Sequence, residues 1–132
     1  MIMVFMKKYF GEGHKLIHIR KEVKVEHPGR YSKLFKGLEY KEAYKVLKGE
    51  IQRMGAFIPP LVNTYMNLSP SMIFFGTGIN DEFGDIYDSG ILINLQEMYP
   101  EKKKRHVETF SALGWRTIKQ LFKRFNLRKP TF

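Results

Sequence analysis

The chain has 132 residues, 43% of them hydrophobic and 14% aromatic. This is enough apolar material for the core of one ordinary domain, and it argues against disorder throughout. The absence of cysteine excludes a disulfide framework, a thiolate metal site and a cysteine nucleophile. The net charge of +10 is concentrated after residue 100, where there are ten Lys and Arg but only two Glu. A basic C-terminal part indicates an acidic partner: nucleic acid, an anionic membrane or an acidic protein.

The first ten residues are apolar and lead into Gly11 and Gly13, which predicts the last turns of a helix. Residues 14–25 alternate imperfectly between apolar and basic side chains and are predicted to be extended. The segment 27–30, His-Pro-Gly-Arg, is predicted to be a turn. No apolar run approaches the roughly 18 residues that a membrane-spanning helix requires.

The clearest helix is predicted over residues 38–54. Apolar side chains recur there at spacings of four and three, which places them on one helical face: Tyr40, Tyr44, Leu47, Ile51 and Met54. Lysines at 41, 45 and 48 fall largely on the other side, and Gly55 supplies a left-handed stop. Pro59 and Pro60 predict the first turn of a short second helix over residues 61–67.

Residues 71–83 and 91–95 are rich in β-branched and aromatic side chains and are predicted to be strands. They are expected to pair antiparallel, because their connection is too short for a crossover helix. Gly76 and Gly78 mark positions where the sheet bends or another backbone approaches closely. A two-stranded hairpin is marginal alone, so it needs covering helices or neighbouring strands, and an open edge favours self-association.

Helices are also predicted over residues 100–110 and 113–125. In the second, apolar side chains recur at spacings of three, four and three: Trp115, Ile118, Phe122 and Phe125. Basic side chains occupy much of the remaining surface of this predicted helix: Arg116, Lys119, Lys123 and Arg124. This helix either packs on its own domain with a solvated basic face, or lies on anionic lipid with its aromatic side chains inserted. Nucleic acid is a weaker partner, because no known nucleic-acid-binding motif is present.

Acidic and amide side chains gather near the junction of the two predicted strands: Asn80, Asp81, Glu82 and Asp85, with Asp88 close by. Carboxylates there are candidates for binding an incoming amine or accepting its proton. The alternative is that Asp and Asn stabilise the turn by bonding the local backbone. His14 and His18 have the spacing of a helical metal pair, but their surroundings are not helical in pattern, so no metal site is expected.

Five segments occur in the order found in one family: Tyr40–Leu47, Ile58–Pro70, Phe75–Asp85, Ser89–Leu92 and Lys103–Phe110. Together they resemble the C-terminal third of the hemolysin-like N-acyltransferases, which are related to the GNAT fold and are associated with acyl-amino-acid lipids such as ornithine and glycine lipids. The Ile-Pro-Pro-Leu and Phe-Gly-Thr-Gly blocks are the most specific parts. The resemblance runs from about Met1 to Phe110.

The resemblance implies an α+β, partial GNAT-like fold in which helices pack on a C-terminal antiparallel strand pair. Residues 1–112 would form the C-terminal portion of the acyltransferase domain, and residues 113–132 a basic amphipathic tail. Segment 58–68 would be the helix before the last two strands, which help to shape the acceptor side. No sequence here matches the preceding half, which holds the acyl-thioester cleft in such enzymes.

The implied activity is transfer of a fatty acyl chain from acyl carrier protein to an amino-acid amine, in lipid biosynthesis. The chain alone is expected to be inactive, and no catalytic residue, bound cofactor or metal is assigned. Expected partners are acidic acyl carrier protein, an anionic membrane, or the other half of the acyltransferase. Candidate contacts for carrier protein or membrane are basic and aromatic: Lys102, Lys103, Lys104, Arg105, Trp115, Arg116, Lys119, Phe122, Lys123 and Arg124.

The alternative function is a free-standing basic module that binds an anionic membrane or nucleic acid. Under either interpretation the expected location is the cytoplasm, with peripheral contact at the inner face of the membrane as a further option.

Overall fold

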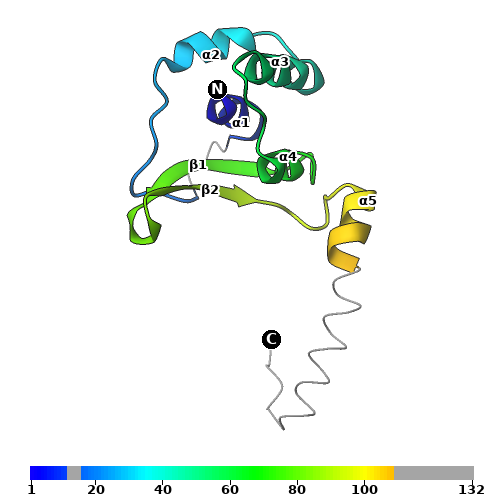
Figure 1. Cartoon of the computed structure of the whole chain (residues 1–132). Coiled ribbons are helices and arrows are strands. Elements are labelled where there is room, and N and C mark those ends of the chain that lie inside the picture. The colour runs from blue at the N-terminus through cyan, green and yellow to red at the C-terminus, as the bar shows by residue number, and fades with distance from the viewer. Residues whose placement is uncertain (12–15, 109–132) are drawn as a thin grey trace.

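The computed structural model describes residues 1–11 and 16–108, in which short helices cover one side of a β-hairpin and a last helix lies beyond the end of its second strand (Figure 1). The helices are α1 (Ile2–Phe10), α2 (Pro28–Leu34), α3 (Tyr40–Arg53), α4 (Pro60–Met66) and α5 (Pro100–Lys103). The strands are β1 (Ile73–Asn80) and β2 (Ile86–Leu92), joined by the 3-10 turn η1 (Asp81–Phe83). A π-helical turn, η2 (Lys104–Glu108), continues α5. The α+β class is therefore confirmed.

Helix α1 is the centre of the core, since it lies between the sheet and the layer of α2 and α3 (Figure 1). Three of its side chains, Phe5, Met6 and Phe10, are buried. The ring of Phe5 meets that of Phe35 edge-on at 5.4 Å between centroids, and both side chains are fully buried. Aromatic pairs of this geometry add about 0.5–1.5 kcal/mol beyond the burial of their area. The helix predicted at this end of the sequence is confirmed.

Helix α3 confirms the strongest sequence prediction, with one correction. Ala43, Leu47 and Ile51 are buried on its inner face, as the spacing of four indicates. Gly55 follows with φ of +71°, the left-handed stop that the sequence predicted. Met54 was assigned to the buried face but is 62% exposed, because α3 ends at Arg53 and the chain has already turned away.

Helix α2 corrects the prediction of a simple turn at residues 27–30. Pro28 occupies the first helical position, where a missing N–H costs nothing and the fixed φ of proline suits the helix. His27 precedes it in a left-handed conformation, with φ of 49°. The reversal of the chain is therefore completed at His27, and the residues after it are helical.

The two strands pair antiparallel, as predicted, with a register shift between Phe74 and Gly76. Strand β2 begins at Ile86, five residues before the predicted strand. Asp88 and Ser89, which precede the predicted strand, belong to β2 because their side chains bond to side chains of β1. Ser89 and Thr77 share a hydrogen bond of 2.8 Å between their hydroxyls, and Asn80 donates to Asp88 at 2.8 Å.

The backbone of residues 21–23 approaches β1 at Gly76 and Gly78, as the positions of these two glycines predicted. The Val23 N–H donates to the Thr77 carbonyl at 2.8 Å, and the Ile79 N–H donates to the Lys21 carbonyl at 2.9 Å. Ile19 lies so close that a Cβ added at either glycine would be 2.7 Å from its side chain. The outer edge of β1 is thus covered, whereas the described residues supply no strand for the outer edge of β2.

Helix α5 is held against the end of α4 by the segment that precedes it. The Tyr99 N–H donates to the Leu68 carbonyl at 3.0 Å, and Ser69 Oγ donates to the Glu97 carbonyl at 3.1 Å. Met98, between these two contacts, is buried. The helix predicted over 100–110 is confirmed as far as residue 108. The predicted helix over 113–125 lies outside the described residues.

Candidate functional site

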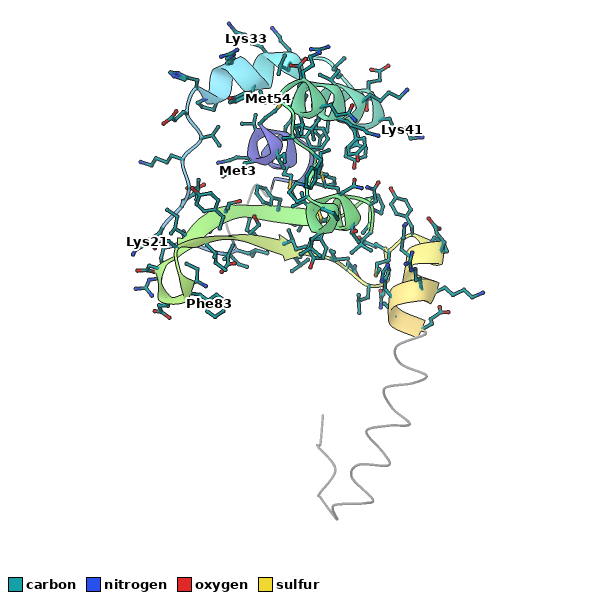
Figure 2. All side chains as sticks on the ribbon, in the orientation of Figure 1. Met3, Lys21, Lys33, Lys41, Met54 and Phe83 are labelled. Atoms are coloured by element: carbon teal, nitrogen blue, oxygen red, sulfur yellow. The ribbon has the colours of Figure 1, made fainter. Side chains whose placement is uncertain are left out.

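Two hollows contain the candidate residues, and the smaller one lies at the turn of the hairpin. It encloses about 360 Å³, and its polar lining includes Asn80, Asp81, Glu82 and Asp88, with Gly78 and Gly90 on the strands. Figure 2 shows Lys21 beside this turn, near Phe83. Asp85, the remaining acceptor-side candidate, does not line the hollow. It takes a left-handed conformation in the turn, with φ of 56°.

The carboxylate of Asp81 is engaged by a neighbouring cation. Lys21 Nζ forms a hydrogen-bonded ion pair with Asp81 Oδ2, and both side chains are about half exposed. This hydrogen bond is the largest of the effects that lower the pKa of Asp81 below its ordinary value. A carboxyl group with a lowered pKa is a weaker base, so Asp81 is better suited to fix the turn or hold a cation than to accept a proton.

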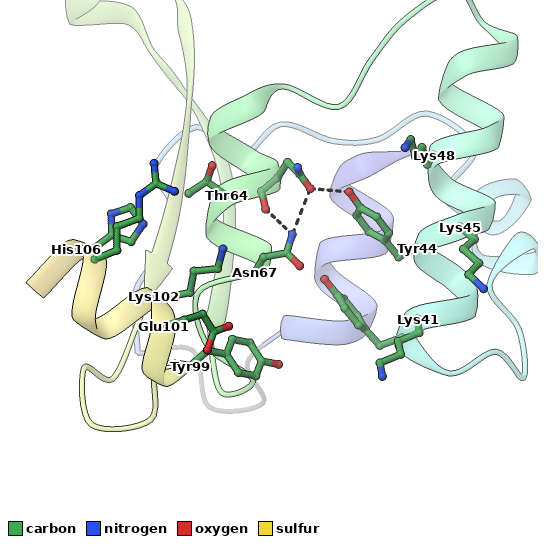
Figure 3. A pocket seen from close by; sticks show the side chains of 13 residues that line it. Lys41, Tyr44, Lys45, Lys48, Thr64, Asn67, Tyr99, Glu101, Lys102 and His106 are labelled. Carbon is green, nitrogen blue, oxygen red and sulfur yellow. Dashed lines mark hydrogen bonds between the residues drawn. The ribbon is translucent and has the colours of Figure 1, made fainter.

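The larger hollow is a groove of about 840 Å³ over α4, between α3 and α5 (Figure 3). Helix α3 contributes Tyr40, Lys41, Tyr44, Lys45 and Lys48. Helix α4 contributes Asn63, Thr64 and Asn67. The third wall comes from the α5 segment and η2, with Tyr99, Glu101, Lys102, Arg105 and His106. We call this the basic groove, because five Lys and Arg line it against one carboxylate.

Hydrogen bonds fix the polar floor of the basic groove. Tyr44 donates its hydroxyl to Asn63 Oδ1 at 2.5 Å. Asn67 Nδ2 donates to the Asn63 carbonyl at 2.7 Å and lies 3.2 Å from Asn63 Oδ1 (Figure 3). Tyr40 donates to the Met66 carbonyl at 3.2 Å. These contacts tie α3 to α4, so the lysines of α3 are held beside a rigid wall.

Tyr40 is the most perturbed titratable group in this groove. Burial is the main cause, followed by the proximity of Tyr44 and Tyr99, and together they raise the pKa of Tyr40 to about 12. The phenol therefore stays protonated at neutral pH and acts as a hydrogen-bond donor. It contributes no charge to oppose the lysines.

The structure brings together only part of the predicted basic contact set. Lys102 and Arg105 line the basic groove, whereas Lys103 and Lys104 do not. The other candidates lie outside the described residues: Trp115, Arg116, Lys119, Phe122, Lys123 and Arg124. Sequence reasoning did not assign Lys41, Lys45 and Lys48 to a site. Their spacing of four and three was the available signal, since it places them along one stripe of α3.

Within residues 1–11 and 16–108, no three His, Asp or Glu side chains converge in a way that would hold a metal ion. The same residues contain no helix with the length and apolarity needed to cross a membrane.

Comparison with known proteins identifies two relatives of this chain whose names state a function. Over 111 residues, or 83% of its length, it is 45% identical to a glycine Nα-acyltransferase of Phocaeicola vulgatus. It is 44% identical, over the same extent, to a glycine Nα-acyltransferase of Bacteroides thetaiotaomicron. The chain spans about a third of the length of these curated relatives, 34% and 33% respectively. No protein-family model matches the sequence, and no solved structure matches it. The identity shows that the chain is related to acyltransferases through a segment equal to about a third of their length.

Proposed function

We propose that this chain is the C-terminal part of an N-acyltransferase with a GNAT-like fold. The 45% identity to a glycine Nα-acyltransferase over most of the chain carries this proposal. The reaction joins a fatty acyl group, carried as a thioester on acyl carrier protein, to the amine of an amino acid. The amine nitrogen attacks the thioester carbonyl, the C–N bond forms, the C–S bond breaks, and the thiol leaves with a proton from the amine. By analogy with the named relatives, glycine is the first acceptor to test.

The shape of the hairpin supports a partial domain. A sheet of two strands is marginal alone, and the described residues cover it with helices on one side (Figure 1). Strand β2, whose outer edge no described residue covers, carries exposed apolar side chains, among them Ile86, Tyr87 and Leu92. In the proposed enzyme, strands from the rest of the domain continue the sheet at this edge. The acyl-thioester cleft would come from that same part.

The hollow at the hairpin turn is the proposed acceptor side. Its three carboxylates, Asp81, Glu82 and Asp88, outnumber the two cations in the lining, Arg20 and Lys21. The small excess of negative charge attracts the ammonium form of an amino acid before the amine is deprotonated. Asn80 is bonded to Asp88, and Lys21 to Asp81, so both partners hold the hollow in shape. Glu82 is the lining carboxylate with neither of these contacts.

A chimera tests the proposal. The matching third of the Phocaeicola vulgatus protein is replaced by this chain, and formation of N-acylglycine is measured with acylated carrier protein and glycine. We expect turnover, because the replaced segments are 45% identical. A soluble, folded chimera that forms no product would contradict the proposal. In the active chimera, Glu82→Gln is expected to raise KM for the amino acid more than it lowers kcat, and Glu26→Gln, an exposed change outside the hollow, is the control.

A second candidate function is a free-standing module for an anionic membrane or nucleic acid, and the basic groove is the observation that favours it. An inactive chimera, together with salt-sensitive binding of the full chain to anionic vesicles or nucleic acid, would favour this module.

A further inference from the structure

The basic groove has features that acyl transfer at the hairpin does not use. It lies over α4, between α3 and α5, whereas the proposed acceptor side is at the far end of the hairpin (Figures 1 and 3). From the geometry of this groove we propose that it is a binding site for a phosphate-bearing ligand. This inference is independent of the proposed acyltransferase function.

Positive charge converges on the groove from two walls. Lys41, Lys45 and Lys48 are spaced by four and three residues on α3, so they line about 10 Å of one wall. Lys102 and Arg105, three residues apart, lie on the wall formed by α5 and η2. Among the described residues, none of these five side chains forms an ion pair within 4.0 Å, whereas Lys7, Lys21 and Arg53 elsewhere do. Uncompensated like charges facing one hollow repel each other, and a bound anion would relieve that repulsion.

The floor supplies neutral donors of fixed orientation. Because Asn67 Nδ2 donates to the Asn63 backbone carbonyl, the Asn63 side-chain atom facing it and Tyr44 must be the oxygen. The Asn63 Nδ2 group then finds no acceptor among the described residues and remains available to a ligand. An amide N–H group beside several ammonium and guanidinium groups is a typical donor set for phosphate oxygens.

The dimensions favour a phosphate-bearing small molecule or head group over a protein surface. The groove holds about 840 Å³, within the 300–1,000 Å³ typical of small-ligand sites. It is concave, and its third wall is fixed by the Tyr99–Leu68 and Ser69–Glu97 hydrogen bonds. Arg105 offers a planar fork for two phosphate oxygens, and the lysines act as point charges around it. Glu101, the carboxylate in the lining, limits the total negative charge that the site accepts.

Binding is tested on the full 132-residue chain, with inorganic pyrophosphate as the soluble probe and phosphatidylglycerol vesicles as the lipid probe. Amide NMR spectra follow the side-chain signals of Asn63 and Asn67, and calorimetry gives the affinity. We expect pyrophosphate or the vesicles to shift these signals. Binding to pyrophosphate identifies a soluble phosphate ligand, and binding to the vesicles alone identifies a lipid head group.

The variant Lys45→Glu/Lys102→Glu changes one cation on each wall. It should weaken binding at least roughly tenfold, or about 1.4 kcal/mol, because each wall loses a charge-assisted contact to the phosphate oxygens. Lys33→Glu/Lys36→Glu, on and just after α2, makes the same change in net charge away from the groove and should bind as wild type does. Lys45→Gln/Lys102→Gln repeats the test if the reversed charges unfold the chain.

Three outcomes would overturn the proposal. The first is that neither probe shifts the Asn63 and Asn67 signals. The second is an equal loss of affinity in the groove variant and the α2 variant, which would show attraction by net charge alone. The third is that polyglutamate of matched charge binds at these signals while both phosphate probes fail, because the occupant would then be an acidic protein.

Discussion

Gly76 is a single residue whose backbone conformation and close contact with Ile19 the hairpin requires. Its φ of +132° is rarely adopted by residues with a side chain, and a Cβ there would be 2.7 Å from Ile19 Cδ1. The end of the Ile19 side chain can move aside, so the backbone conformation dominates the cost of a substitution. Gly76→Ala should therefore lower the free energy of unfolding by about 1–3 kcal/mol.

Urea unfolding measures this change, and Gly49→Ala is the matched control. Gly49 lies inside α3, and a Cβ there would meet nothing within 4 Å. Alanine is the better helix former, so the control should gain about 0.5–1 kcal/mol. If Gly76→Ala were as stable as the wild type, the positive φ described for Gly76 would be wrong.

Tyr40 gives a pH-dependent prediction whose sign follows from its pKa. The folded pKa is about 12 and the unfolded value is 10.0. The folded chain therefore holds the phenolic proton more tightly, and this contribution to stability is fully present below pH 10. It is lost as pH rises from 10 towards 12, because the unfolded chain ionises first.

The free energy of unfolding should thus fall more steeply above pH 10 in the wild type than in Tyr40→Phe. Denaturant unfolding at several alkaline pH values measures the two slopes. Tyr40→Phe also loses the hydrogen bond to the Met66 carbonyl, so it should be less stable at neutral pH. Equal slopes would show that Tyr40 is not buried as described.

The elements differ in how far sequence reasoning predicts them. Helix α3 is predictable because its inner face repeats at spacings of three and four. The start of α2 also had a local signal, proline at the first helical position, which the prediction of a turn did not use. The polar beginning of β2 is not predictable in this way, because it depends on side chains of β1 that lie opposite it. Ser89 belongs to a strand only because Thr77 lies opposite it. Likewise, a stripe of lysines on α3 becomes a groove wall only when α4 and α5 pack beside it.

Strand β2 is the element expected to mediate self-association of the chain. Tyr87 is 70% exposed and Leu92 44% exposed on a strand whose outer edge no described residue covers. The isolated chain should therefore self-associate through this edge. Tyr87→Lys/Leu92→Lys should shift it towards monomer, because lysines at an edge oppose pairing.

Sedimentation velocity over a range of concentrations follows this shift. The control, Phe57→Lys/Leu61→Lys, also replaces two exposed apolar side chains with lysine, but outside the two strands. It should associate as the wild type does. A wild-type chain that stays monomeric at every concentration would contradict the open edge.

For the whole molecule, the two-stranded sheet and the partial match to the relatives both support the proposal of a partial domain. Helices α1, α3 and α4 build a core that positions the hairpin, and the hairpin presents an edge and an acidic turn. The described residues contain no second sheet that would form a thioester cleft between strands. The relatives are about three times as long as the 111 residues that match, so they have sequence from which those strands can come.

The uncovered edge of β2 should also be required for activity. The chain alone should form no N-acylglycine, whereas mixing it with the separately produced remaining two thirds of the Phocaeicola vulgatus protein should give product. Tyr87→Lys/Leu92→Lys should reduce that product strongly, because the two parts are expected to pair through β2. Phe57→Lys/Leu61→Lys should leave it unchanged. Turnover by the chain alone, or a mixture in which both variants behave alike, would show that the edge of β2 is not where the enzyme is completed.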